Sequence, residues 1–437
     1  MHRYLPHSRK DIKEMLDTLQ IDNIEELFNY VPDDARIKGE INLPNMLSEC
    51  ELIDHLSSIA SKNKELKVFR GDGAYDHYAP VVIDTLISRQ EFLTSYTPYQ
   101  PEIAQGTLQY IFEYQSMICE LTGMDITNAS MYDGPTSAAE AMFVATSSLR
   151  RKKILVSNTV ANRIKDVVYT YAKFRDIEVE EVSDDNGLTS IDDLKSKLNK
   201  DIAGILVQNP NKYGVIEEYS EVANLVHEVG GYLIDYVDPH TLSLVKTPAS
   251  MGADIVVGDG QSLGIPLSFG GPYVGFMAVG QKLMRKLPGR IVGMSNDLEG
   301  KRAFVLTLQA REQHIRREKA NSNICSNQSL MALYVTIYLS LLGKKGFKEV
   351  GTRSYKAAHY LLKKLEETNK FKLKYDLPFF NEFVVTTKVD VDLLNKELLN
   401  HNILGGSKIS SNEWLLCANE KMTKKDIDDF VKIVGGL

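Results

Sequence analysis

Short apolar, β-branched runs alternate with amphipathic segments through the middle of the chain, and this alternation constrains the fold more than any other feature. Segments such as 191–198 and 219–229 have helical periodicity and lie between the runs. Strands separated by helices form βαβ units and a mostly parallel sheet that is covered on both faces. The sequence therefore predicts a large α/β domain. Its expected strands are 154–157, 178–182, 203–208, 232–235, 254–257 and 273–279.

The two ends of the chain have other patterns. Near the N-terminus, apolar residues fall on one face of a short helix that begins after Ser8, and further helices are expected near 23–31 and 49–61. We predict an N-terminal helical arm (1–65), a large α/β domain (66–324) and a small C-terminal α+β domain (325–437). Other predicted helices are 101–122, 302–319, 326–342, 348–367, 391–400 and 423–434, and other predicted strands are 383–388 and 414–419.

The composition narrows the classes of protein that this chain can be. Its 437 residues carry a net charge of −7, and this acidic excess argues against a nucleic-acid-binding protein. No stretch approaches the roughly 20 apolar residues of a membrane span, so we expect a cytoplasmic chain without membrane contact. The cysteines have no CxxC spacing, so we predict reduced, mostly buried thiols and no metal site. They are Cys50, Cys119, Cys325 and Cys417.

The sequence Gly134-Pro135-Thr136-Ser137 is a candidate anion site at the start of a helix. Proline suits the first helical turn. The free N–H groups of that turn, with the hydroxyls of Thr136 and Ser137, could form a cradle for a phosphate. An ordinary capped helix explains the same residues, and the pattern alone leaves both interpretations open.

Two further candidates follow predicted strands of the sheet. Asp235 ends the run at 232–235, at the edge where α/β folds bind ligands. Its carboxylate could pair with the ring nitrogen of a pyridine cofactor, or it could cap the next loop. The stretch 258–273 is rich in Gly and Pro, so its backbone is expected to approach another group closely. It contains Gln261, whose amide cannot form an imine.

Hydroxyl and aromatic side chains gather in the loop before the predicted helix at 101–122. Tyr96, Thr97 and Tyr99 could line a substrate channel or an interface, and surface packing explains them equally well. The charged run at 311–319 is predicted to be a solvated or interface helix with i,i+4 charge pairs. Neither segment identifies a reaction by itself.

Taken together, several long motifs resemble one family almost from end to end. The chain resembles the α subunit of two-subunit glycine dehydrogenase (decarboxylating), part of the glycine cleavage system P-protein. The motifs that carry the resemblance lie at 23–28, 69–78, 92–105, 132–141, 209–214, 260–275 and 312–327.

The resemblance implies a pyridoxal-phosphate-dependent transferase fold of type I, like that of aspartate aminotransferase. It implies an α2β2 heterotetramer that decarboxylates glycine and passes the aminomethyl group to the lipoyl arm of H-protein. It places Gln261 where the β subunit has its cofactor-binding lysine, and Gly260 where that subunit has a histidine. Asp235 is expected at the pyridine-partner position, with Thr136 and Ser137 as vestigial cofactor contacts. Pyridoxal phosphate is therefore expected on the β subunit, and this chain alone is expected to be inactive.

Two other functions stay open at this point. The chain could be a self-sufficient pyridoxal-phosphate lyase or decarboxylase that uses another lysine. It could also be a non-enzymatic regulatory module that has kept the fold.

Overall fold

The computed structural model describes residues 4, 6–39, 41–320, 322, 324 and 327–437. The chain forms two compact units, Met1–Lys64 and Glu65–Leu437. The predicted division into three parts stays a prediction. Cys325, one of the four thiols, lies outside the described residues; Cys50, Cys119 and Cys417 are free, and of these only Cys417 is buried.

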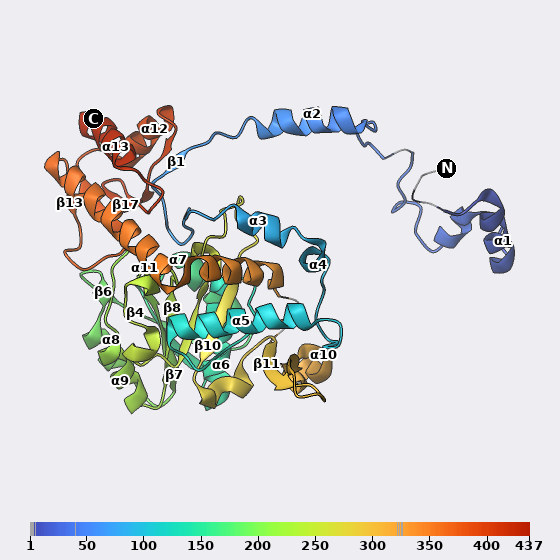
Figure 1. Cartoon of the computed structure of the whole chain (residues 1–437), viewed down its shortest axis with the longest axis horizontal. Helices are drawn as coiled ribbons and strands as arrows, with labels where there is room; N and C mark the ends of the chain where they lie inside the picture. Colours follow the sequence, from blue (N-terminus) through green and yellow to red (C-terminus); the bar gives the residue numbers. More distant parts are fainter. Residues whose placement is uncertain (1–3, 5, 40, 321, 323, 325–326) are drawn as a thin grey trace. The chain divides into compact units, whose positions relative to one another are not determined.

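The first unit consists of three short helices, which are blue in Figure 1: α1 (Arg9–Leu19), the 3₁₀ helix η1 (Ile24–Phe28) and α2 (Glu49–Ala60). Ser8 caps α1 as expected, because its hydroxyl accepts from the backbone N–H of Asp11 while the Asp11 carboxylate accepts from the Ser8 N–H. None of these helices has a buried residue. Their apolar faces, which include Ile12, Met15 and Leu19, are exposed.

The second unit is built on a seven-stranded sheet (Figure 1). Its strands are β2 (Ile126–Thr127), β3 (Lys153–Ser157), β4 (Glu178–Val182), β7 (Ile202–Asn209), β8 (Tyr232–Val237), β9 (Ile255–Asp259) and β10 (Gly275–Val279). They lie in the order β2-β10-β9-β8-β7-β3-β4. All neighbours from β9 to β4 are parallel, and β10 is antiparallel to both β9 and β2. The predicted mostly parallel sheet is therefore confirmed.

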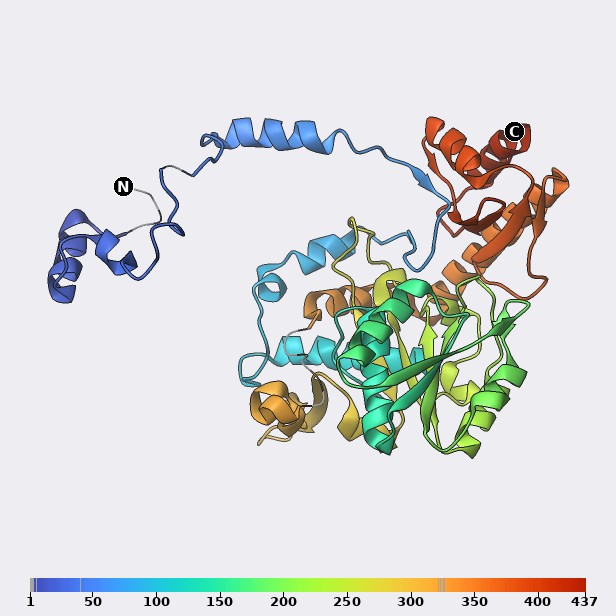
Figure 2. The same ribbon diagram turned by 180° about the vertical axis from the view of Figure 1, so that it is seen from behind.

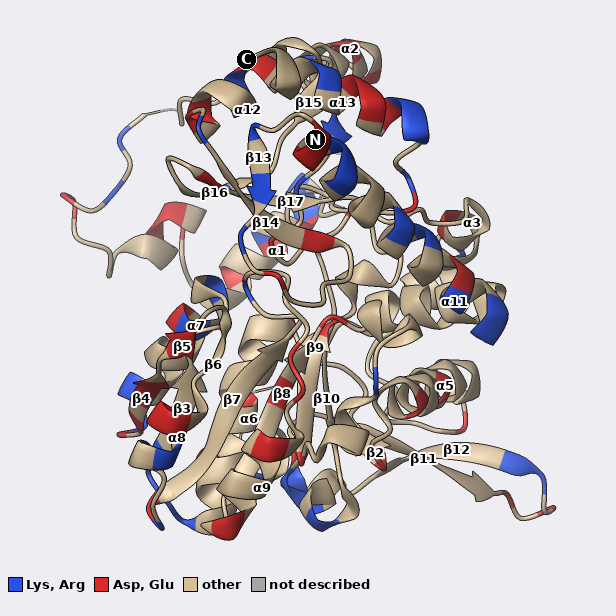
Figure 3. Cartoon of the chain, turned by 90° about the vertical axis from the view of Figure 1, so that its left-hand side faces the viewer, with Lys and Arg blue, Asp and Glu red and all other residues tan. Residues whose placement is uncertain are grey.

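Helices cover both faces of this sheet. On one face lie α6 (Gly134–Leu149) and α7 (Asn162–Lys173), seen in front of the sheet in Figure 2. On the other lie α5 (Gln105–Thr122), α9 (Ser220–Glu228) and part of α11 (Ser329–Glu367). β7 and β10 carry no charged residue and are tan throughout in Figure 3. Burial on both faces explains why these strands read as continuous apolar runs.

The C-terminal part has its own antiparallel sheet and core. Its strands lie in the order β13 (Phe371–Leu373), β14 (Glu382–Thr387), β17 (Glu413–Cys417) and β16 (Ser407–Ser410). Helices α12 (Val391–Asn400) and α13 (Lys424–Gly436) pack on it around Trp414 and Phe430. Phe69 joins this core, next to the parallel pair β1 (Lys67–Val68) and β15 (Ile403–Leu404). The segment that follows Phe69 therefore starts from the C-terminal core.

The remaining elements are short. They are α3 (Val82–Ile87), α4 (Gln90–Leu93), β5 (Asp184–Asp185), β6 (Leu188–Thr189), α8 (Ile191–Lys197), η2 (Thr241–Ser243), η3 (Pro248–Met251), η4 (Gly260–Ser262) and η5 (Gln281–Lys286). No helix in the described part of the chain is long and apolar enough to cross a membrane.

The helix predicted at 302–319 is wrong. Residues Arg302–Thr307 form strand β12, which pairs antiparallel with β11 (Ile291–Asn296). The amide of Gln105 on α5 bonds both the N–H and the C=O of Phe304, so α5 fixes the outer edge of this hairpin. The charged run beyond it forms only short turns, η6 (Gln309–Arg311), α10 (Gln313–Arg316) and η7 (Arg317–Lys319). The short apolar run from Ala303 to Leu306, with aromatic and β-branched residues, was the signal for a strand.

Candidate functional site

A small cavity lies at the carboxyl ends of β8 and β9, where parallel sheets place ligands. Its volume is about 20 Å³, close to the space of a single water molecule. Residues from the sheet edge line one side, and the segment at 73–75 together with Arg163 of α7 lines the other. The lining includes Tyr75, Arg163, Tyr236, Asp238, Asp259, Gln261 and Ser262.

Gln261 lies in η4, directly after β9, and is 1% exposed. Its Nε2 donates to the backbone oxygens of Tyr75 (2.8 Å) and Ile265 (2.7 Å). Its Oε1 accepts from the backbone N–H of Tyr75 at 2.7 Å. Both amide hydrogens and the carbonyl are therefore used inside the chain. Gln261 acts as a neutral cross-link that fixes the Tyr75 backbone over the cavity.

Carboxylates occupy the first turn of α6, the predicted anion cradle. Asp133 accepts from the N–H of Thr136 at 2.8 Å, and Asp259 accepts from the N–H of Gly134 at 2.9 Å. The hydroxyl of Ser137 is fully buried and donates to the Asp133 carbonyl at 2.6 Å. Burial raises the pKa of Asp259 to about 7. Donors that would hold a phosphate are already bonded to acidic side chains.

Asp235 does not line this cavity. Successive side chains of a strand point to opposite faces, and its neighbours Ile234 and Tyr236 both pack on the α6 face. Asp235 therefore points to the other face, where Glu217 and Tyr219 are its neighbours. It is 1% exposed, and neither carboxyl oxygen has a hydrogen-bond partner among the residues that the structure describes. Burial first, and the Glu217 carboxylate second, raise its pKa well above the ordinary value.

The carboxylate at the cavity is Asp238, just beyond the end of β8. Its Oδ1 accepts from the N–H of His240 at 3.1 Å and from the hydroxyl of Ser262. Burial raises the pKa of Asp238. Sequence reasoning missed this residue because the predicted strand ended at Asp235, and the true strand continues two residues further.

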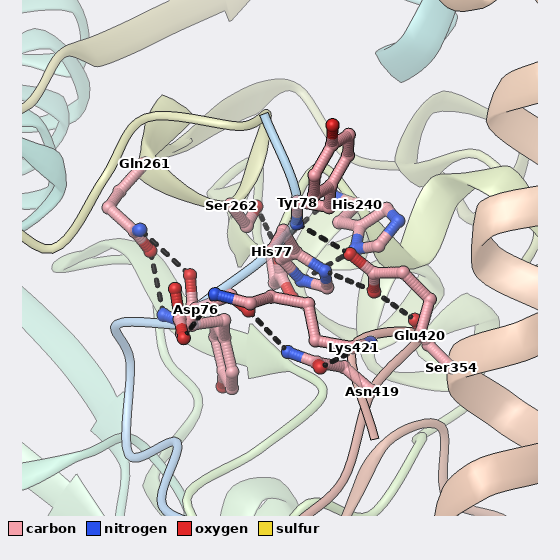
Figure 4. A network of polar contacts seen from close by, with 12 residues as sticks. Asp76, His77, Tyr78, His240, Gln261, Ser262, Ser354, Asn419, Glu420 and Lys421 are labelled. Atoms are coloured by element: carbon pink, nitrogen blue, oxygen red, sulfur yellow. Dashed lines mark hydrogen bonds and ion pairs between the residues drawn. The ribbon is translucent and has the colours of Figure 1, made fainter. Parts of the chain in front are cut away.

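A buried polar network holds the segment after Phe69 against the C-terminal part (Figure 4). His77 lies between Glu420, whose Oε2 is 2.8 Å from Nδ1, and His240, whose Nδ1 is 2.7 Å from Nε2. Burial alone would raise the pKa of Glu420, but the adjacent His77 outweighs it and holds that pKa at about 2. Burial and then His77 push the pKa of His240 well below its usual value. The network is therefore a chain of polar contacts from the Glu420 carboxylate through His77 to His240.

Other bonds fix the same segment. The Asp72 N–H donates to Glu382 at 2.6 Å, and Lys421 pairs with Asp76 at 2.6 Å. Burial raises the pKa of Glu382 to about 7. The sequence motif at 69–78 was noticed only as a part of the resemblance. Its Gly, Asp, Tyr and His residues were the available signal that it forms a loop fixed by polar contacts.

These residues do not fit pyridoxal phosphate. The cavity is more than tenfold smaller than the roughly 300 Å³ of an ordinary small-molecule pocket. Among the described residues that line it there is no lysine. The helix turn that would face a phosphate faces Asp133 and Asp259 instead. Of the four predicted cofactor contacts, the structure brings only Gln261 to the cavity; Thr136, Ser137 and Asp235 lie elsewhere.

The third group of candidates lines a separate cavity of about 100 Å³. Tyr96 and Thr97 form part of its wall together with the buried Arg290. Arg290 donates from Nη2 to the hydroxyl of Tyr99 at 3.1 Å, and its Nε is 3.6 Å from the Glu312 carboxylate. Its guanidinium also lies 5.3 Å from the centre of the Tyr99 ring. This pairing connects the loop at 95–99 to the segment after β12.

The chain is similar to one group of known proteins. It matches the family described as "Glycine cleavage system P-protein" over residues 2–434. It is 47% identical, over 446 residues and 100% of both chains, to a Bacillus cytotoxicus protein named "Probable glycine dehydrogenase (decarboxylating) subunit 1". It also superposes on a structure described as "Crystal structure of glycine decarboxylase (P-protein) of the glycine cleavage system, in inhibitor-bound form", with 38% identity, a TM-score of 0.92 and 100% of both chains covered. The predicted resemblance is thereby confirmed.

A more distant structure supports the fold alone. The glutamate decarboxylase of Lactobacillus brevis has 13% identity and a TM-score of 0.69, with 94% of this chain and 98% of that chain covered. Such neighbours are pyridoxal-phosphate-dependent enzymes of fold type I, so the predicted fold class is confirmed.

Proposed function

The chain belongs to the glycine cleavage system P-protein family, and from that premise we propose that it is the cofactor-free subunit of a two-subunit glycine decarboxylase. The bonding of Gln261 is the observation that carries this proposal. A covalent cofactor site needs an amine at this place, whereas Gln261 has an amide whose hydrogen-bonding groups are all used by Tyr75 and Ile265.

The partner subunit carries the pyridoxal phosphate in this proposal. When bound, that cofactor supplies an electron sink for the carbanion that forms when glycine loses CO₂. The assembly is an α2β2 heterotetramer, the acceptor of the aminomethyl group is the lipoyl arm of H-protein, and the compartment is the cytoplasm. The present chain contributes a rigid α/β body whose own cavity is closed, and Tyr96, Thr97 and Tyr99 offer a wall or an interface toward the partner.

Co-expression with a candidate β subunit tests the proposal. Glycine–bicarbonate exchange should require both subunits, and omission of either one should abolish it. Pyridoxal phosphate should co-purify with the β subunit and be absent from the isolated chain. If the isolated chain exchanges bicarbonate or retains the cofactor, the chain is a self-sufficient enzyme and the proposal fails.

Gln261→Lys tests whether the surroundings, and not only the missing amine, exclude the cofactor. The lysine variant should show no imine absorption band with pyridoxal phosphate, because Asp133 and Asp259 already accept from N–H groups at the start of α6 and the Tyr75 backbone is fixed at the cavity. Borohydride reduction and peptide mapping check the result, with Gln261→Met as the size-matched control. Covalent labelling at position 261 would show that one substitution restores the site and that the cavity is not closed.

A further inference from the structure

A second and larger cavity, of about 250 Å³, lies between α6 and α7. Four of its nine lining residues are aromatic: Tyr132, Phe143, Tyr171 and Phe174. Two residues of opposite charge, Glu140 and Arg175, also line it. Thr136, predicted as a cofactor contact, belongs to this cavity and not to the one beside Gln261.

Glu140 is a buried carboxyl without a cationic partner in bonding contact. It is 6% exposed, and its Oε1 accepts one hydrogen bond, from the Ser322 hydroxyl at 2.9 Å. The described residues give its Oε2 no hydrogen bond and form no ion pair with it. Burial raises the pKa of Glu140 to about 7, against smaller opposing effects of Ser322 and Arg175. A buried acid left in this state gains stability from an external cation.

Arg175 supplies the opposite charge at the exposed end of the same cavity. Its guanidinium lies 5.1 Å from the centre of the Phe143 ring, which holds it beside the aromatic wall. Arg175 acts on Glu140 through space, yet the structure contains no ion pair between them. The cavity thus separates a carboxyl group and a guanidinium that do not neutralise each other directly.

We propose that this cavity binds a small α-amino acid as a zwitterion, with its ammonium group toward Glu140 and its carboxylate toward Arg175. The separated charges require a ligand with both signs, and the aromatic wall favours an ammonium group over a neutral amine. The volume limits the side chain to a small one. The choice of glycine as the first probe rests on the proposed function; the zwitterion class rests on the cavity alone.

Equilibrium dialysis of radiolabelled glycine against the isolated full-length chain measures this binding. Glycine should bind, and methylamine or acetate, each with one of the two charges, should compete at least about tenfold more weakly, because each forms only one charge-assisted contact. Glu140→Gln and Arg175→Gln should each weaken glycine binding about tenfold or more. Thermal melting identifies any variant that fails to fold.

Matched controls separate this cavity from the rest of the chain. Glu382→Gln removes another buried carboxyl whose pKa is raised to about 7, and Arg150→Gln removes an arginine near the other end of α6. Both should bind glycine as the wild type does. Absence of glycine binding to the folded wild-type chain, or equal loss in the controls and the two cavity variants, overturns the proposal.

The pH dependence gives an independent measure. Among the described residues, the titratable and charged groups that line the cavity with Glu140 are Arg175, just after α7, Tyr171 of α7 and Tyr132 before α6, and Asp133 acts on Tyr171. Only the carboxylate form attracts an ammonium group, so affinity should rise by about tenfold from pH 6 to pH 8 as Glu140 ionises. Glu140→Gln should remove this dependence. A flat wild-type profile would mean that Glu140 does not contact the ligand.

The two proposals fail separately. If glycine does not bind the isolated chain while the complex exchanges bicarbonate, the zwitterion site is wrong and the proposed function stands. If glycine binds and is lost in Glu140→Gln, while no β subunit yields activity, the site stands and the proposed function is wrong.

Discussion

The cavity beside Gln261 and the cavity beside Glu140 are both lined by buried polar groups, but they treat those groups differently. In the first, the Gln261 amide and Asp259 are bonded to other parts of the chain, and Glu382, outside the cavity wall, bonds Asp72 of the adjoining segment. In the second, Glu140 keeps one internal hydrogen bond and faces about 250 Å³ of space. The Gln261 amide of the first cavity is satisfied by the chain's own backbone, whereas the second cavity has charged groups that a ligand could satisfy.

The closed cavity depends on a single segment. Residues 72–78 are fixed by Glu382, Gln261, Lys421 and Glu420, which come from both the central sheet and the C-terminal part. A buried polar network is stable when every member has a partner. Two kinds of experiment test this difference between the cavities. One removes a bonding partner at the closed cavity, and the other titrates a buried carboxyl group near each cavity.

The largest effect is expected from Gln261→Ala. The change leaves the N–H and C=O of Tyr75 and the C=O of Ile265 without their side-chain partner, at roughly 1–3 kcal/mol for each buried group that water does not reach. We expect the free energy of unfolding to fall by about 3 kcal/mol. Hydrogen exchange should become faster at residues 72–78. Chemical denaturation and exchange mass spectrometry measure the two quantities.

The control is Gln281→Ala, which truncates an exposed glutamine and should change the stability by less than about 0.5 kcal/mol. If Gln261→Ala is as mild as this control, the bonds to Tyr75 do not hold the segment in place. The two cavities would then differ in size alone.

A smaller, pH-dependent effect is expected at Glu382. Burial raises the pKa of its carboxyl to about 7, so the folded state binds a proton that the unfolded chain releases near pH 4.5. The contribution of the protonated Glu382 carboxyl to the free energy of unfolding is fully present below pH 4.5 and is lost as the pH rises through 7. Glu382→Gln stays neutral and lacks this loss. Relative to the variant, the wild type should therefore lose about 2 kcal/mol between pH 4.5 and 6.5.

Denaturation at a series of pH values measures that difference, and Glu140→Gln provides the comparison. Without ligand the two variants should behave alike, because burial raises the pKa of Glu140 to about 7 as well. With glycine present, the loss at Glu140 should shrink, since an ammonium ligand favours the carboxylate, while the loss at Glu382 should not change. Equal responses to glycine at both carboxyl groups would contradict the distinction between the cavities.

Local patterns predicted the sheet well and the site poorly, for physical reasons. Strands β3, β7, β8 and β9 are buried on both faces, so their apolar runs show directly in the sequence. The role of Gln261 depends on Tyr75, which is 186 residues away in the chain, and no local pattern reports such a pair. The charged residues at 311–319 suggested a helix over 302–319. Residues 302–307 instead pair with 291–296 in a hairpin that Gln105 bonds, and a helix cannot continue through them.

Asp235 in β8 and Asp238 just after it show the limit most clearly. Asp235 and Asp238 both lie near the carboxyl end of the strand, and only the strand's true end and the alternation of its side chains decide which one reaches the cavity. A one-residue change of register moves a side chain to the opposite face of a sheet. The sequence could place a carboxylate at this edge but could not choose between them.

The smallest effect is expected from Asp235→Asn. Asp235 points away from the cavity, and burial raises the pKa of its carboxyl well above the ordinary value, so the group is neutral at pH 7 and similar in shape to the amide. Thermal melting of the variant should shift by the equivalent of less than about 1 kcal/mol. Bicarbonate exchange by the complex with a β subunit should be unchanged. A tenfold loss of exchange with an unchanged melting temperature would contradict this prediction, because Asp235 would then contribute to the reaction although it does not line the cavity beside Gln261.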